Sequence, residues 1–333
     1  MAATAGPDNE NQMTRTNIMP ALLALLILLW CLPVQQASCA RSGQAKVFVV
    51  HGDSRIAEDF AHRLRERLAE TLEGTGIELL EHLPPATEAE RHGRFLVLVG
   101  GRTLQAYRSE PEAWRLPALV LLVTRQRFEQ TWHQLPEGPR SRLSAVYLDQ
   151  PPSRQFLLAI HAFPQRKRIG VLLSRTTLPV LPLLKKLSQG TGRRLVTQRL
   201  ASEGRLFPVM ERLFERSDVF LALPDPEVVN RTTLQPLLLT SYRYRIPVVA
   251  FSRAYVKAGA TAAVYTPPEG LIEEAAEIVN RQLSDGPAPL PPPHYSSRFR
   301  VHFNRRVARS LGIALPSEHQ VEQAIRAWEA NNR

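Results

Sequence analysis

Between Ser217 and Gln282 the sequence alternates short apolar runs with longer helical segments, and this order constrains the fold more than any other feature. The runs at residues 219–223 and 246–251 are too short for helices and are bounded by turn residues, which is typical of strands buried on both faces of a parallel sheet. A glycine turn leads to a third strand at Ala262 and a final helix. The order predicts a doubly wound α/β sheet whose loops point toward a ligand.

The same alternation extends through the chain from Lys46. A break at Asp149-Gln150-Pro151-Pro152 separates two sets of predicted strands, which indicates a second sheet of the same kind. Two α/β lobes with polar loops at the carboxyl ends of their strands describe a binding cleft. A proline-rich stretch at 287–293 predicts a linker, and residues 301–311 and 318–330 predict short helices. The other expected strands are at 46–50, 77–83, 94–99, 116–123, 143–148, 169–173 and 195–200.

The amino-terminal region predicts a secretory signal peptide over residues 1–40. Residues 21–32 are apolar but too few to span a bilayer comfortably, and Ser38 and Ala40 provide the small residues expected before a cleavage at Arg41. A lipoprotein signal is the alternative and would make Cys39 a lipid anchor. Both cysteines, Cys31 and Cys39, lie in this region, so we expect an exported, periplasmic chain without disulfides.

The charge is strongly basic and dispersed. Beyond residue 40 the chain holds 41 basic and 29 acidic residues, because Arg15, Asp8 and Glu10 are the charged residues before that point. Arginines predominate, and no aromatic or zinc-finger pattern accompanies them, which argues against nucleic-acid binding. Contact with anionic lipid or a cell-wall polymer fits better, although nothing in the sequence localises it. The histidines show no metal-ligand spacing, and we expect neither a metal nor a cofactor.

Several motifs of the chain match the pattern of one known family. They are Ser217-Asp218-Val219 with Pro224-Asp225, Ile246-Pro247-Val248, Val256-Lys257-Ala258-Gly259-Ala260, and Asn304, Ala308, Leu311-Gly312-Ile313 and Leu315-Pro316. With these motifs the chain resembles a divergent ABC transporter substrate-binding protein of the type I periplasmic class. The resemblance covers most of the chain from Lys46 and is clearest after Pro164.

The resemblance implies a non-enzymatic protein that binds a small molecule, such as an amino acid, between two lobes that close by a hinge motion. An ABC permease would be its membrane partner. Lobe 1 would hold residues 41–149 and 262–286, and lobe 2 would hold residues 150–261 and 287–333, with three crossings between them. The chain departs from the family pattern at Val123-Thr124-Arg125-Gln126 and at Pro267-Pro268-Glu269-Gly270.

The candidate ligand-binding residues share one position, at the carboxyl end of a predicted strand or in the first turn of the following helix. Gly101, Arg102 and Thr103 offer backbone N–H groups and a guanidinium to an anion, but they also suit an ordinary strand-to-helix turn. Asp225 suits a ligand ammonium or a helix cap. The remaining candidates, each equally suited to capping, are Asp53, Ser54, Thr124, Ser174, Thr176, Asn230, Ser252 and Arg253.

Two other classes of function remain open at this point. Gly52-Asp53-Ser54 after a strand resembles the nucleophile block of GDSL-type esterases, with Ser54 as nucleophile, but a glycine turn capped by Asp or Ser accounts for the same residues. A periplasmic sensor or scaffold that docks a membrane partner without transport is the other alternative. The departures from the family pattern near the cleft favour it.

Overall fold

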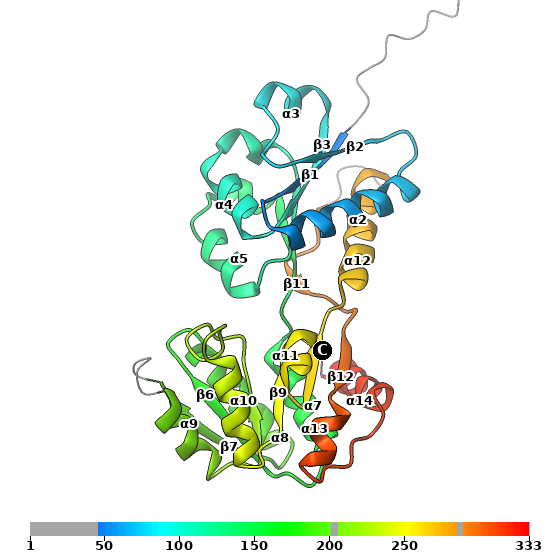
Figure 1. Ribbon diagram of the computed structural model, residues 1–333. Coiled ribbons are helices and arrows are strands. Elements are labelled where there is room, and N and C mark those ends of the chain that lie inside the picture. Colours follow the sequence, from blue (N-terminus) through cyan, green and yellow to red (C-terminus); the bar gives the residue numbers. More distant parts are fainter. Residues whose placement is uncertain (1–45, 201–205, 285–288, 333) are drawn as a thin grey trace, which may run out of the picture. The chain divides into compact units, whose positions relative to one another are not determined.

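The computed structural model describes residues 46–200, 206–284 and 289–332, and these build two six-stranded, mostly parallel sheets (Figure 1). The predicted α/β class with two sheets is confirmed. Within the described ranges no helix is both long enough and apolar enough to cross a membrane. The expected signal peptide lies outside the described residues.

The first sheet has the strand order β11-β5-β4-β3-β1-β2, and all of its strand pairs are parallel. Successive residues of its strands enter opposite cores: Val47 packs in one cluster and Phe48 in the other. This burial on both faces explains why the strands read as continuous apolar runs. The strands are β1 (Lys46–His51), β2 (Gly76–Leu80), β3 (Gly93–Val99), β4 (Ala118–Leu121), β5 (Leu143–Tyr147) and β11 (His294–Tyr295).

Helices cover both faces of this sheet, and one of them comes from far along the chain. Helix α12 (Pro268–Ser284) lies beside α2 (Arg55–Thr71), and its Leu271 and Ala275 enter the same core as Val47 (Figure 1). The other helices of this lobe are α3 (Ala86–His92), α4 (Gly101–Ser109), α5 (Arg125–Trp132), α6 (Glu137–Arg140) and the 3₁₀ turn η1 (Pro111–Arg115).

The second sheet has the order β12-β10-β9-β8-β6-β7, in which only β12 is antiparallel. Its strands are β6 (Arg168–Leu173), β7 (Arg194–Arg199), β8 (Val219–Leu221), β9 (Val248–Ala250), β10 (Ala262–Tyr265) and β12 (Arg300–Phe303). Its helices are α7 (Pro152–Ala162), α8 (Leu181–Gly190), α9 (Leu206–Phe214), α10 (Leu234–Arg243), α11 (Arg253–Ala258), α13 (Arg305–Ser310), α14 (Glu318–Asn331) and the 3₁₀ turn η2 (Leu178–Val180).

Three expectations about the chain beyond residue 261 are wrong. Residues 262–265 were expected in the first lobe, but β10 pairs with β9 and β12 of the second sheet, and only the helix after it joins the first. Residues 300–303 form strand β12 rather than a helix, since Val301 and Phe303 alternate into the core. Within the expected second-lobe tail, β11 pairs with β5 of the first sheet.

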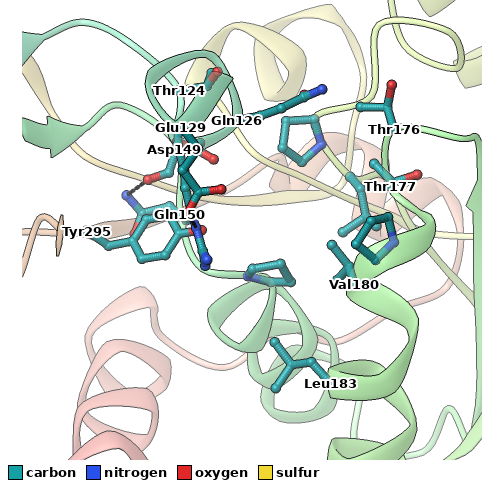
Figure 2. Close-up of a pocket in the computed structure, with 15 residues that line it drawn as sticks. Thr124, Gln126, Glu129, Asp149, Gln150, Thr176, Thr177, Val180, Leu183 and Tyr295 are labelled. Atoms are coloured by element: carbon teal, nitrogen blue, oxygen red, sulfur yellow. Dashed lines mark hydrogen bonds and ion pairs between the residues drawn. The ribbon is translucent and has the colours of Figure 1, made fainter. Parts of the chain in front are cut away.

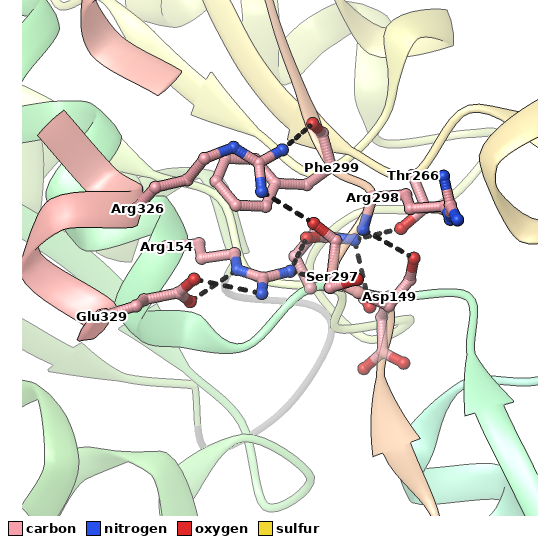
Figure 3. A network of polar contacts seen from close by, with 10 residues as sticks. Asp149, Arg154, Thr266, Ser297, Arg298, Phe299, Arg326 and Glu329 are labelled. Carbon is pink, nitrogen blue, oxygen red and sulfur yellow. Dashed lines mark hydrogen bonds and ion pairs between the residues drawn. The ribbon is translucent and has the colours of Figure 1, made fainter. Parts of the chain in front are cut away.

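The chain passes between the sheets three times, after β5, after β10 and after β11. A buried arginine of α7 joins these passages (Figure 3). The Arg154 guanidinium donates to Gln150 Oε1 at 2.8 Å, to the Ser296 carbonyl at 2.6 Å and to Glu329 of α14 at 2.6 Å. Gln150 in turn donates to Thr266 Oγ1 at 2.6 Å. Arg154 thus joins the first and third passages to the last helix, and Gln150 connects this network to the second passage.

Candidate ligand-binding pocket

A cavity of about 420 Å³ lies where loops of the two sheets come together (Figure 2). The loops after β4 and β5 supply the polar residues of one wall, and the loops after β6 and β8 supply the other. Its lining includes Thr124, Arg125, Gln126, Glu129, Asp149, Gln150, Pro152, Thr176, Thr177, Pro179, Val180, Leu183, Leu223, Pro224 and Tyr295. A cavity at the carboxyl ends of strands, of this volume and mixed polarity, is typical of a small-molecule site.

The backbone between β4 and α5 is bent to present the first wall. Leu122 has a φ of 56°, in the left-handed region that costs a non-glycine residue about 1 kcal/mol. Thr124 then caps α5 by accepting a hydrogen bond from the Arg127 N–H. The first turn of α5, with Arg125, therefore begins at the cavity.

Asp149 is the carboxylate of the cavity with a perturbed acidity. Burial raises its pKa to about 6, although the Arg125 N–H donates to its Oδ1 at 2.8 Å and favours the ionised form. A carboxylate that burial deprives of water in this way gains from a cationic ligand, since a positive group nearby would replace lost solvation.

Arg125 and Tyr295 lie beside this carboxylate. The Arg125 guanidinium pairs with Glu129 at 2.6 Å and lies over the Tyr295 ring, 6.0 Å from its centroid. Tyr295 also meets Tyr147 edge to face at 5.1 Å. Burial raises the pKa of Tyr295 to about 12, so its hydroxyl stays protonated and can both donate and accept.

The opposite wall combines hydroxyl groups with apolar side chains. Thr176 donates to Glu227 Oε1 at 3.2 Å, and its own N–H is bound by Ser174 Oγ at 3.0 Å. Val180 and the 40 % exposed Leu183 continue the wall along the start of α8. The cavity therefore has one side rich in charge and one side with hydroxyls and an apolar floor.

Asp225, the strongest single candidate in the sequence, lies behind this wall rather than on it. It is 1 % exposed, and its carboxylate accepts from Thr177 Oγ1 at 2.6 Å, from the Glu227 N–H at 3.0 Å and from the Ser174 N–H at 3.3 Å. These bonds tie the loop after β8 to the loop after β6. In this structure the carboxylate supports the pocket wall and has no free face toward the cavity.

Three candidates of the first lobe gather at a separate cavity of about 280 Å³. Asp53, Arg102 and Thr103 line it, and Arg102 forms an ion pair with Asp53. Both charged side chains are more than two-thirds exposed, so water already solvates them. Gly101 begins α4 beside them, after Gly100 with its φ of 100°.

The remaining candidates occupy helix starts. Ser252 accepts from the Tyr255 N–H and caps α11, on which Arg253 is exposed. Asn230 Oδ1 accepts from the N–H groups of Thr232 and Thr233. Of the twelve sequence candidates, the structure brings Thr124 and Thr176 to the cavity lining, with Ser174 and Asp225 in the layer behind them.

The esterase interpretation gains no support from the surroundings of Ser54. Esterases of the GDSL type take their base from a distant Asp-x-x-His pair, and the sequence contains one such pair, Asp59–His62. It lies within α2, the helix that Ser54 begins. His62 is eight residues along that helix, about 12 Å from Ser54 at 1.5 Å per residue, too far to take its proton. Among the described residues no group of acidic, histidine or cysteine side chains could hold a metal ion.

Two-lobed α/β architecture with a cavity at the strand ends defines a class of ligand-binding proteins, and the family comparison agrees. The family model "ABC transporter substrate binding protein" matches residues 97–325, about two thirds of the chain. The chain belongs to this family, as the sequence motifs predicted. No curated protein matches it.

Solved structures show the same fold at low sequence identity. A conserved domain protein from Vibrio cholerae is 21 % identical, with a TM-score of 0.55 over 86 % of this chain and 98 % of that one. A Streptococcus pneumonia domain crystallised with L-Trp is 16 % identical, with a TM-score of 0.55 over 84 % and 98 %. A ligand-free, open substrate-binding protein with adhesive properties from Clostridium difficile is 16 % identical, with a TM-score of 0.63 over 82 % and 96 %. The fold is that of the type I periplasmic binding proteins.

Sequence reasoning missed most of the polar residues that line the cavity. Asp149 and Gln150 were interpreted only as a break between lobes, although a carboxylate directly after a predicted strand is the same signal that singled out Asp225. Arg125 lies in the segment noted as a departure from the family, and Glu129 follows that segment within α5. Tyr295 follows a proline run, and no local pattern connects it with β5, which it joins as strand β11.

Proposed function

We propose that this protein is the exported, periplasmic solute-binding component of an ABC-type uptake system, and that its solute is a small molecule such as an amino acid. Membership of the substrate-binding family supports the general role. The observation that carries the proposal is the cavity at the strand ends, in which a half-buried carboxylate of raised pKa stands beside an arginine and a tyrosine ring. A permease would be the membrane partner.

An amino acid matches the groups that line the cavity. Its ammonium would add a positive charge beside the Asp149 carboxylate, and its carboxylate would accept from the Arg125 guanidinium or the Gln126 side-chain amide, which line the same cavity. An apolar side chain would rest between Tyr295 and Leu183. Because the walls belong to different sheets, a ligand that touches both would favour a closed arrangement, with the three passages as the hinge.

A thermal-unfolding screen of amino acids tests this proposal. A true ligand at 100 times its dissociation constant should add about 2.7 kcal/mol to the free energy of unfolding. Asp149→Asn should weaken that ligand's binding about 30-fold or more, since a charged hydrogen bond contributes roughly 2 kcal/mol.

The matched control is Asp53→Asn, the same change at an exposed strand-end carboxylate outside the cavity. It should leave the affinity unchanged. A ligand whose affinity is the same in Asp149→Asn as in the parent protein would show that its site lies elsewhere. A screen in which no amino acid, peptide or small anion shifts unfolding would favour the sensor or scaffold alternative.

A further inference from the structure

One edge of the second sheet carries a row of exposed cations. The amino ends of five parallel strands form this edge together with the carboxyl end of antiparallel β12. An exposed lysine or arginine lies at this end of every strand. In sheet order from β12 to β7 these residues, here named the basic edge, are Arg305, Lys257, Arg245, Arg216, Lys167 and Arg194.

Backbone hydrogen bonds hold the strand ends of this edge in register. Each neighbouring pair of strands is joined by at least one such bond at the edge itself. They run from Asn304 N to Thr261 O (2.9 Å), Thr261 N to Val248 O (3.0 Å), Phe220 N to Pro247 O (2.9 Å), Asp218 N to Arg168 O (2.8 Å) and Arg194 N to Lys167 O (2.9 Å). With strands about 4.8 Å apart, six strands align the cations along roughly 24 Å.

Acidic side chains leave this charge largely uncompensated. Across the described part of the chain, none of the six cations forms an ion pair. Of the acids near this edge, Asp218 pairs with Arg168 at 2.7 Å and Glu318 accepts from the Phe303 N–H at 2.8 Å. Glu215 is exposed next to Arg216 in the sequence. Burial lowers the pKa of His161, and the charge of Arg193 near the same edge lowers it further.

The opposite edge of the same sheet is different. Its loops carry the acids Asp225 and Glu227 after β8, together with the exposed arginines Arg175, Arg199, Arg231 and Arg253. The pocket edge therefore mixes both signs of charge in its loops, whereas the basic edge has an exposed cation at the end of every strand.

Apolar side chains accompany the basic edge. Helix α10 ends there, and its Leu239 and Tyr242 are 64 % and 46 % exposed. They are three residues apart and so share one face of the helix. An exposed leucine and tyrosine beside a row of cations suit the boundary between phosphate headgroups and acyl chains, where amphipathic aromatics are favoured.

We propose that the basic edge docks this lobe onto an anionic phospholipid surface. The row is about 24 Å long, and of its six cations Arg194 lines a hollow of about 620 Å³ at one end. A row of this length matches many phosphates in a plane better than a single phosphate ion. The accompanying Leu239 and Tyr242 favour a lipid surface over a dissolved polyanion. Such docking is independent of whether the pocket holds an amino acid.

Binding to vesicles tests the docking. The full chain should bind vesicles of phosphatidylcholine with added phosphatidylglycerol more tightly than phosphatidylcholine vesicles, and added salt should weaken this preference. Neutralising three edge cations (K167Q, R216Q and R245Q together) should weaken the binding about a hundredfold. Tyr242→Ser should weaken binding to these vesicles without changing its salt dependence.

The matched control neutralises three exposed cations away from the edge, R55Q, R65Q and R231Q, with the same change in net charge. It should keep most of the affinity. Residues 21–32, the apolar run of the expected signal peptide, are the same in every variant. Any vesicle binding that they contribute is therefore equal in all of them and does not affect the comparison. Equal losses in the two triple variants, no preference for phosphatidylglycerol, or tighter binding of a duplex oligonucleotide than of vesicles would each overturn the proposal. Thermal unfolding of each variant confirms that it is folded.

Discussion

Asp149 and Asp225 follow strands of different sheets in the same manner, yet their surroundings are opposite. Asp225 is 1 % exposed and accepts three hydrogen bonds that hold two loops together. Asp149 borders a cavity, accepts a hydrogen bond from the Arg125 N–H and has a pKa that burial raises to about 6. The comparison teaches that a carboxylate enclosed by hydrogen-bond donors stabilises a fold, whereas one that borders a cavity, here called under-satisfied, is available to a ligand.

The largest change in stability is expected at Arg154, which donates to Gln150, the residue after Asp149. Arg154→Met should lower the free energy of unfolding by about 4 kcal/mol, because it leaves Glu329 and the Ser296 carbonyl without their buried partner. Denaturant unfolding measures the loss. Arg326→Met is the control: Arg326 also lies 4.3 Å from the Phe299 ring centroid, but it donates to main-chain carbonyls and not to Glu329. Equal losses in the two variants would show that packing on Phe299, and not the buried pair, carries the effect.

Removing the satisfied carboxylate should come next. Asp225→Ala should lower the free energy of unfolding by about 3 kcal/mol, since the Thr177 hydroxyl and the Glu227 N–H lose their acceptor and the Ser174 N–H keeps only Thr177 Oγ1. Asp225→Asn, which keeps one acceptor oxygen, should cost less. Chemical denaturation at pH 7 gives both values. A loss below about 1 kcal/mol for Asp225→Ala would remove the contrast with Asp149.

Removing the under-satisfied carboxylate should stabilise the protein. The raised pKa of Asp149, about 6 against an ordinary 3.8, means that its contribution to stability is present below pH 3.8 and is lost as the pH rises through 6. The free energy of unfolding of Asp149→Asn should therefore be roughly 1 to 2 kcal/mol higher than that of the parent protein at pH 7 and equal to it near pH 3.5. Denaturation curves of both proteins at the two pH values measure this difference. A variant that is less stable than the parent at pH 7 would contradict the raised pKa of Asp149.

The smallest effect is expected at Ser252, a strand-end residue that is neither a carboxylate nor part of the cavity lining. Ser252→Ala should lower the free energy of unfolding by about 1 kcal/mol, the usual contribution of an N-cap, because the Tyr255 N–H loses its acceptor. The affinity for any pocket ligand should stay the same, as Ser252 does not line the cavity. A change in affinity at constant stability would instead assign Ser252 to the site.

Much of the fold could be predicted because its signals are local. Val47 and Phe48 belong to a short apolar run buried on both faces, and that run reads as a parallel strand wherever it occurs. The membership of β10 was missed because Ala262 follows a helix and a turn that fit either lobe. Strand β12 was missed because its partner, β10, is distant in sequence and antiparallel.

The pocket was harder to predict because capping and ligand binding use the same residue types. Thr124 lines the cavity and also caps α5, whereas Ser252 caps α11 and lies away from it. No local pattern separates the two cases. Tyr295 enters the cavity because two residues after a proline run pair with β5, a contact across more than a hundred residues.

The sequence by itself determined the alternation of strands and helices, the family and the excess of basic residues, since each depends on neighbouring residues or on composition. The tertiary structure decided which carboxylate faces a cavity, which strand belongs to which sheet, and where the positive charge collects. These depend on pairings between distant segments. Burial and strand order, which arise only on folding, separate Asp149 from Asp225 and align six dispersed cations along one edge.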